Sequence, residues 1–400
     1  MDELTISIID RGSASLAALQ TALGQFAAQS RARVHVRFQP WQEARQSLGK
    51  TGFPNDGSID IAEIDTAWMS DVIASDTLRP YSAHEMDQCR ASDEYLPALL
   101  ECTHLVGETD TWAVPWLADT ILLHYRKDLF VSARINPQMG LCNLAELQAT
   151  AKSLSAAGIH IPIALPCKVY PSNLIRIVAS WVWRAGGDFI HRDGKQVLFD
   201  QPEFIQGVKD YFHLYQTLSP EGRQTLATVG TQEALFKHNA AMAIGGPWVM
   251  QAPSTFPNPE FARNLAVARL PGVPFVGGST LAIRRGLTCE REAIELVQFL
   301  STSPSIIAYA RQAGLAPARL RGINSPELSA SPAHAVLVES IRCGRTLPAV
   351  KQWSMIEERL GQALSSICSQ LLAAPARSAD NLITRTLSQT AREINHMLAQ

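Results

Sequence analysis

Charged residues are scarce in this sequence. They make up 18% of its 400 residues, and 35 basic side chains against 37 acidic ones leave a net charge of −2. An average soluble protein carries about 25% charged residues. Nucleic-acid-binding domains usually present a basic face, so this balance argues against a nucleic-acid partner. Hydrophobic residues reach 46%, which argues against an intrinsically disordered chain.

Long apolar runs are also missing. A membrane-spanning helix needs about 20 consecutive apolar residues, whereas the nearest candidate, residues 173–183, contains Arg176 and is followed by Arg184. No basic segment followed by an apolar one, the pattern of a secretory leader, precedes the first expected strand. We therefore expect a soluble chain of two to three domains of about 100–200 residues each. It is either cytosolic or an exported protein whose leader has been removed.

The cysteines are dispersed. Cysteine occurs 7 times, without CxxC spacing, and the nearest two, Cys89 and Cys102, stand 13 positions apart. This spacing argues against a zinc knuckle and against a dense disulfide framework. A local disulfide between Cys89 and Cys102 is one alternative, and burial of the thiols as small hydrophobic side chains is the favoured one.

Sequence motifs of catalysis are missing as well. The chain has no GxSxG elbow, no HExxH and no GxxxxGK[ST] loop. His84 and Glu85 begin like a zinc-binding helix, but Gln88 stands where the second histidine would be. Residues 10–13 could hold an anion on free backbone amides, although one glycine favours an ordinary helix cap. We expect no enzyme, no cofactor and no metal site.

The first seventy residues alternate between strand-like and helix-like patterns. Residues 4–9 and 34–38 have the composition and period of strands, and residues 59–64 suggest a third. Between the first two strands apolar residues recur at helical spacing, at Leu16, Leu19, Leu23 and Phe26. This β-α-β-α-β order predicts an α/β fold with a mostly parallel sheet flanked by helices.

Ligands of parallel sheets bind beyond the carboxyl ends of the strands. Residues 10–13, 40–41 and 65–68 are therefore expected to share one rim. Asp65 and Thr66 are also expected to cap a helix at that point.

The middle of the chain is richer in helix. Helices are expected over residues 143–157, 171–185, 202–215 and 231–237, then a strand over 279–283 and a helix over 291–301. The last fifty residues are expected to be helical, with a break near 373–377. Segments with proline or glycine at 114–116 and 271–278 are candidate interdomain crossings.

Tryptophans mark the expected ends and crossings of these elements. The sequence has 8 of them, and those so placed are Trp41, Trp68, Trp116, Trp248 and Trp353. An indole offers a flat face with one N–H donor, which suits the apolar face of a pyranose. Carboxylates accept hydroxyl protons, and Asp65 and Asp119 lie within a few residues of such indoles. The alternative for each indole is packing in a core or between domains.

Three segments resemble a known family in their order and spacing. Residues 112–128 have the sequence WAVPWLADTILLHYRKD, residues 240–248 AAMAIGGPW, and residues 277–283 GGSTLAI. They are similar to the first crossing, the second-lobe ligand loop and the return crossing of bacterial family 1 extracellular solute-binding proteins. These are the maltose-binding-protein-like receptors of sugar ABC transporters. The resemblance runs nearly the whole chain.

The resemblance implies a two-lobed periplasmic-binding-protein (Venus-flytrap) fold, each lobe a mostly parallel sheet flanked by helices. Lobe 1 would comprise residues 1–113 and 271–342, and lobe 2 residues 117–268 and 345–400. Hinge crossings would lie near 114–117, 268–278 and 340–348. Hinge closure around a ligand is a known transition of such folds.

The resemblance also implies a function. The protein would capture a sugar or sugar derivative in the interlobe cleft and deliver it to the membrane permease subunits of an ABC importer. It would act as a monomer, in the periplasm or outside the cell. The implied ligand-binding residues are Trp41, Asp65, Trp68, Trp116, Asp119, Gly246, Trp248, Gly277, Gly278, Arg311 and Trp353.

Two alternatives stay open. The cysteines and the missing leader favour a cytosolic sugar sensor on the same fold. A glycoside-active enzyme would need two carboxylates at a defined separation, which a sequence does not show. The sugar is also open between neutral, acidic, phosphorylated and sulfonated, because basic residues lie near the expected cleft segments: Lys168, Arg176, Arg184 and Arg311.

Overall fold

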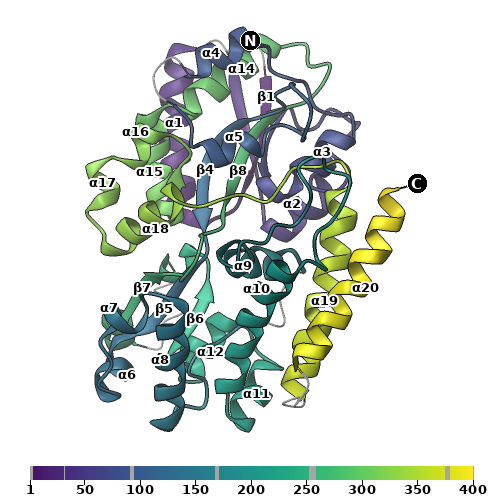
Figure 1. Cartoon of the computed structure of the whole chain (residues 1–400). Coiled ribbons are helices and arrows are strands. Elements are labelled where there is room, and N and C mark those ends of the chain that lie inside the picture. The colour runs from purple at the N-terminus through teal and green to yellow at the C-terminus, as the bar shows by residue number, and fades with distance from the viewer. Residues whose placement is uncertain are drawn as a thin grey trace. The chain divides into compact units, whose positions relative to one another are not determined.

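A computed structural model of the chain describes residues 3–30, 32–90, 94–166, 171–251, 258–373 and 379–399. The chain divides into two compact units (Figure 1). Unit 1 comprises Met1–Asp119, Val276–Arg342 and Pro348–Ser354. Unit 2 comprises Thr120–Phe275, Cys343–Leu347 and Met355–Gln400.

The short segment Pro348–Ser354 differs from the sequence expectation, which assigned residues 345–400 to the second lobe. It belongs to unit 1 because the Val106 amide donates to the Ala349 carbonyl at 2.8 Å. Lys351 adds an ion pair to Glu108 at 2.7 Å. The preceding residues belong to unit 2, where the Arg345 amide donates to the Pro274 carbonyl at 2.9 Å. Hydrogen bonds between segments far apart in the sequence determine where the chain passes from one unit to the other. Local sequence patterns do not indicate such pairing.

Unit 1 is built on a six-stranded sheet in the order β2-β1-β3-β8-β4-β9. The strands are β1 (Glu3–Ile9), β2 (Arg33–Gln39), β3 (Ile61–Asp65), β4 (Val114–Thr120), β8 (Val276–Ile283) and β9 (Ala316–Pro317). β1 is parallel to both β2 and β3, while β3–β8 and β4–β9 are antiparallel. The parallel trio confirms the β-α-β-α-β order expected from the sequence.

Helices flank the six-stranded sheet of unit 1 (Figure 1). The first, α1 (Ser13–Gln29), buries Leu19, Leu23 and Phe26, as their spacing predicts. The others are α2 (Trp41–Ser47), α3 (Met69–Ala74), α4 (Ala83–Arg90), α5 (Pro97–Glu101), α14 (Glu290–Leu300), α15 (Ser303–Ala313), α16 (Leu320–Ile323), α17 (Pro326–Ser329) and α18 (Pro332–Arg342). A 3₁₀ turn, η1 (Thr66–Trp68), separates β3 from α3.

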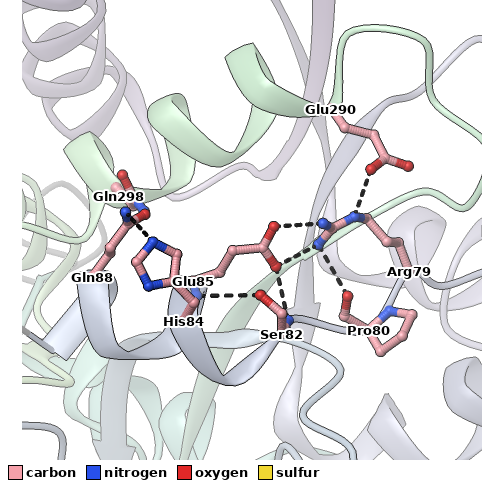
Figure 2. Close-up of polar contacts among 8 residues, drawn as sticks. All are labelled: Arg79, Pro80, Ser82, His84, Glu85, Gln88, Glu290 and Gln298. Atoms are coloured by element: carbon pink, nitrogen blue, oxygen red, sulfur yellow. Dashed lines mark hydrogen bonds and ion pairs between the residues drawn. The ribbon is translucent and has the colours of Figure 1, made fainter.

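Helix α4 is fixed to unit 1 by a polar cluster around Arg79 (Figure 2). Ser82 and Glu85 form a reciprocal capping box, in which the Ser82 amide donates to the Glu85 carboxylate at 2.8 Å and the Glu85 amide to the Ser82 hydroxyl at 3.3 Å. Arg79 donates to Glu85 at 2.6 Å and to Glu290 of α14 at 3.0 Å. The hydrogen bonds from Arg79 lower the pKa of the Glu85 carboxyl. Glu85, which in the sequence resembled part of a zinc-binding helix, is thus the partner of Arg79.

Unit 2 contains a three-stranded sheet in the order β6-β5-β7. Its strands are β5 (Leu122–Arg126), β6 (Met242–Gly245) and β7 (Leu265–Arg269). Both pairings are antiparallel, so the expectation of a mostly parallel sheet in each lobe is wrong for this one. Hydrophobic periodicity reports which face of a strand is buried and not which way the strand runs.

The rest of unit 2 is largely helical. The elements are α6 (Lys127–Ser132), α7 (Pro137–Gly140), α8 (Leu144–Ala156), α9 (Pro171–Arg184), α10 (Pro202–Phe212), η2 (His213–Thr217), α11 (Pro220–Leu226), α12 (Thr231–Lys237), η3 (Pro247–Gln251), α13 (Pro259–Asn264), α19 (Trp353–Ala373) and α20 (Ala379–Leu398). The C-terminal helix belongs to this unit because Asn395 both accepts from the Val197 amide and donates to the Val197 carbonyl. The expected break near 373–377 lies largely outside the described residues.

Gly278 is required by the sheet of unit 1. Its φ is +144°, and a Cβ there would lie 2.0 Å from the Leu117 carbonyl oxygen. We predict that Gly278→Ala lowers the free energy of unfolding by about 2–4 kcal/mol, because overpacking adds to backbone strain. Gly286 also has a positive φ but nothing within 4 Å of a Cβ. Its Ala variant should lose only about 1 kcal/mol, and equal losses in chemical denaturation would contradict the close-approach argument.

Candidate functional site

The carboxyl ends of β1, β2 and β3 form one rim of unit 1, because these three strands are parallel. Asp65 ends β3 and caps the following turn by accepting from the Ala67 amide at 3.0 Å. Its other oxygen accepts from the Trp41 indole at 3.0 Å. The predicted cap is therefore confirmed, and the same carboxylate orients a half-buried indole at the rim.

A buried ion pair lies beneath this rim. The Glu63 side chain has no exposed surface and pairs with Arg11 at 2.7 Å. It also accepts from the Ile9 amide at 2.9 Å and from the Ser279 hydroxyl at 2.6 Å. Burial opposes the charge of Arg11, but Glu63 and Tyr309 together outweigh burial and raise the pKa of the guanidinium. The charge of Arg11 is therefore balanced by Glu63, and Arg11 has a structural role in the sheet.

The helix start at residues 10–13 forms an ordinary turn. The Asp10 carboxylate accepts from the Gly12 amide at 2.8 Å. That amide is consequently occupied by the protein's own carboxylate, as expected for the cap rather than for an anion site.

Three of the expected ligand-binding indoles are buried, and two of them have packing partners inside unit 1. Trp68 is 1% exposed within the hydrophobic core. Trp116 is 2% exposed, stacks on Tyr309 with ring centroids 4.9 Å apart, and donates to the Leu300 carbonyl. Trp353 is 3% exposed. The contacts of Trp68 and Trp116 are those of the packing alternative, and we do not carry the three buried indoles into the proposed site.

The remaining expected residues of unit 1 divide by exposure. Asp119 is half-buried on β4, and Arg311 is exposed on α15. Gly277 and Gly278 are buried in β8, and Gly278 is explained by its approach to Leu117. Close backbone contact is thus present at Gly278, but it is contact within the sheet.

Trp248 of unit 2 is presented differently. It follows β6 in the loop Gly245-Gly246-Pro247-Trp248 and is 46% exposed. A Cβ at Gly246 would lie 2.1 Å from the Trp248 ring, so the indole packs directly on the glycine backbone. A large aromatic ring supported by backbone and open to solvent is the geometry of a stacking platform.

Beneath this loop lies His124, which the sequence analysis missed. It is fully buried on β5, and its Nε2 lies 3.0 Å from the Gly246 carbonyl oxygen. Its Nδ1 has no hydrogen-bond partner among the described residues. Burial lowers the pKa of His124 to about 4, so the imidazole is neutral at neutral pH. The available signal was one polar residue in the apolar run Ile121-Leu122-Leu123-His124.

A separate pocket of about 340 Å³ lies near the carboxyl end of α1. Its lining includes Phe26, Gln29, Gln88, Cys89, Gln298 and Phe299. Helix α1 begins at the rim and its 17 residues span roughly 25 Å, so this pocket is distinct from the rim. It contains none of the expected ligand-binding residues.

The basic residues left open by the sequence are partly accounted for. Arg184 forms an ion pair with Asp210. Arg176 is 5% exposed, with its guanidinium over the Phe275 ring at 5.6 Å. Lys168 lies outside the described residues.

The described residues also bear on metal sites, thiols and membrane spans. They contain no group of three or more His, Cys, Asp or Glu that could hold a metal ion. Cys89 and Cys102 are both buried, and because Cys89 is a free thiol the two do not form a disulfide. None of the helices in the described ranges is long and apolar enough to span a membrane.

The buried imidazole predicts a pH dependence of stability. Above pH 6.5 His124 is neutral in both folded and unfolded states; as the pH falls, the unfolded chain binds the proton first. The free energy of unfolding should therefore decrease between about pH 6.5 and about pH 4, with His124 contributing about 3 kcal/mol of the loss. His124→Gln should remove that part of the slope in urea denaturation series. An unchanged slope would contradict a neutral, buried His124.

Comparisons with known proteins agree with this architecture. The family of bacterial extracellular solute-binding proteins matches residues 12–305. No protein of curated function matches the sequence of the chain.

Solved structures match along the whole chain. The sugar-binding protein MalE of Xanthomonas citri has a TM-score of 0.81 at 20% identity, over 99% of this chain and 97% of that one. A Thermotoga lettingae ABC-transporter solute-binding protein bound with alpha-D-tagatose has a TM-score of 0.76 at 20% identity, over 100% of each chain. UgpB of Mycobacterium tuberculosis in complex with glycerophosphocholine has a TM-score of 0.74 at 16% identity, over 99% and 98%.

These neighbours share the two-lobed α/β fold that the sequence predicts. The family match covers well over half of the chain. The chain belongs to the bacterial extracellular solute-binding proteins.

Proposed function

We propose that the protein is a carbohydrate-binding receptor that hands its ligand intact to the permease of an ABC importer. The observation that carries this proposal is the Trp248 platform, an indole 46% exposed and supported by the Gly246 backbone. Such an exposed, rigid ring loses little entropy on binding and stacks well on the apolar face of a sugar. Two similar solved proteins, the sugar-binding protein MalE and a solute-binding protein bound with alpha-D-tagatose, support the proposal.

The proposed contacts come from both units. Unit 1 would contribute Trp41, oriented by Asp65, together with Asp119. Unit 2 would contribute Trp248 and the Gly246 backbone. We propose that the two units act as the lobes and that closure over the sugar completes the site. The hinge would be the places where the chain passes from one unit to the other, after residues 119, 275, 342, 347 and 354.

The proposed location is the periplasm or the cell exterior. The family is extracellular. In addition, Cys368 is disulfide-bonded, and structural disulfides persist mainly in oxidising compartments. These two observations favour an exported receptor over the cytosolic sensor. We further propose that it binds as a monomer.

The test is a ligand panel read by thermal shift. Neutral mono- and oligosaccharides, sugar acids, sugar phosphates and glycerophosphodiesters would each be added in excess. At 100 times its Kd a ligand stabilises the folded state by about 2.7 kcal/mol, and mass spectrometry should recover it unchanged. A panel without any shift, or a cleaved sugar, would reject the receptor proposal.

We predict that Trp248→Ala weakens binding of the sugar found in that panel by about 1–3 kcal/mol, because an aromatic contact is lost. Folding should be nearly unaffected, since the side chain is 46% exposed. The measurement is isothermal titration calorimetry with denaturation as the control. Met139→Ala, at a side chain 66% exposed on α7, is a matched variant that should bind normally. Wild-type affinity in Trp248→Ala would show that the indole is no platform.

A second variant, Asp65→Asn, tests the rim. The amide oxygen can still cap the turn through the Ala67 amide, but the amide nitrogen cannot accept from the Trp41 indole. We therefore expect about 1 kcal/mol lower stability and about 1.5–3 kcal/mol weaker sugar binding. Calorimetry and denaturation measure the two effects separately. Lower stability with unchanged affinity would restrict Asp65 to its structural role.

A further inference from the structure

The loop that carries Trp248 is hydrogen-bonded to the sheet of unit 2 at the Gly246 carbonyl. Strand β6 ends at Gly245, and the Gly246 carbonyl accepts from the His124 ring at 3.0 Å. The Val249 amide also points to this oxygen, but at a longer 3.4 Å. The imidazole is thus the closer of these two donors, and it belongs to the neighbouring strand.

His124 occupies a position where an apolar residue would be the simpler choice. It lies on the central strand β5, opposite Ala243 of β6 and Val267 of β7, and has no exposed surface. Burying a polar ring without full hydrogen bonding is costly, and its Nδ1 is unpaired among the described residues. Leucine or methionine at this position would avoid that cost, but neither could donate a hydrogen bond to the Gly246 carbonyl.

The same carbonyl connects His124 to the indole. Gly246 is the residue on which the Trp248 ring packs, since a Cβ there would reach ring atoms at 2.1 to 2.4 Å. A displacement of the Gly246 peptide would therefore displace the indole. Gly245 is also close, because a Cβ there would lie 3.9 Å from the His124 ring. Histidine, glycine backbone and indole form a continuous stack of contacts from sheet to surface.

We propose that His124 is a positioning residue that fixes the orientation of the Trp248 platform through the Gly246 carbonyl. This inference rests on the proposed carbohydrate function for its effect on affinity. His124 does not touch the ligand. It donates its Nε2 proton, because a carbonyl oxygen can only accept, and it therefore acts as the neutral Nε2–H tautomer.

The test compares two substitutions of His124 in two backgrounds. Gln can donate an amide proton toward the Gly246 carbonyl, whereas Met fills similar space without a donor. We expect His124→Met to weaken sugar binding about 3- to 10-fold, the scale of one hydrogen bond, and His124→Gln to restore part of that affinity. In a Trp248→Ala background His124→Met should change affinity less than about 2-fold, because the platform is already absent.

A ligand-free measurement separates this inference from the proposed function. The fluorescence contribution of Trp248 is the difference between each protein and its Trp248→Ala counterpart. Acrylamide should quench this Trp248 fluorescence more strongly in His124→Met than in the wild-type protein. The matched control is His334→Met, at the buried histidine of α18 in unit 1, whose Nε2 also has no partner among the described residues. It should change neither quenching nor affinity.

Each outcome decides the inference. Lower stability of His124→Met with unchanged quenching and affinity would reduce His124 to a packing residue and overturn the proposal. An equal loss of affinity with and without Trp248 would also overturn it. If quenching rises but no sugar in the panel binds, His124 does position the indole and the carbohydrate proposal fails instead.

Discussion

The carboxylate of Glu63 joins three strands of the six-stranded sheet from a position with no exposed surface. It accepts from the Ile9 amide on β1, from the Ser279 hydroxyl on β8, and from the Arg11 guanidinium that closes the space above it. A buried charge is tolerated only when it is paired and hydrogen-bonded, and removal of one partner typically costs about 3–5 kcal/mol. The parallel N-terminal strands and the strand that arrives more than 200 residues later are therefore mutually dependent.

The half-buried Trp41 of unit 1 and the exposed Trp248 of unit 2 are held by different means. In unit 1 a side-chain carboxylate, Asp65, accepts directly from the Trp41 indole, so the ring is oriented by its own polar edge. In unit 2 the Trp248 ring rests on a glycine backbone that is itself held from within the sheet. A direct hydrogen bond fixes the direction of a ring edge, whereas a packed backbone fixes the plane of the ring. Sugar recognition needs both kinds of control, for hydroxyl groups and for apolar faces.

The sequence predicted those parts of the structure that depend on local period. The strand at Glu3–Ile9, helix α1 and the shared rim all follow from alternating hydrophobic patterns and from the cap at Asp65. It did not predict strand direction in unit 2 or the return of Pro348–Ser354 to unit 1, since both depend on pairing between distant segments. The burial of Trp68 and the role of Gly278 also depend on tertiary neighbours. The sequence also does not indicate which carbonyl group accepts the hydrogen bond from His124, a single histidine in an apolar strand.

The place of β8 between β3 and β4 has a consequence for the order of events during synthesis. Ribosomes add about 5–20 residues per second, so roughly 11–42 s separate the synthesis of Asp65 from that of Val276. Until then β3 lacks its neighbour and Glu63 lacks Ser279. The N-terminal segment thus cannot complete its sheet while it emerges from the ribosome. The six-stranded sheet is therefore closed by a late pairing between distant segments, the kind of step that slows folding.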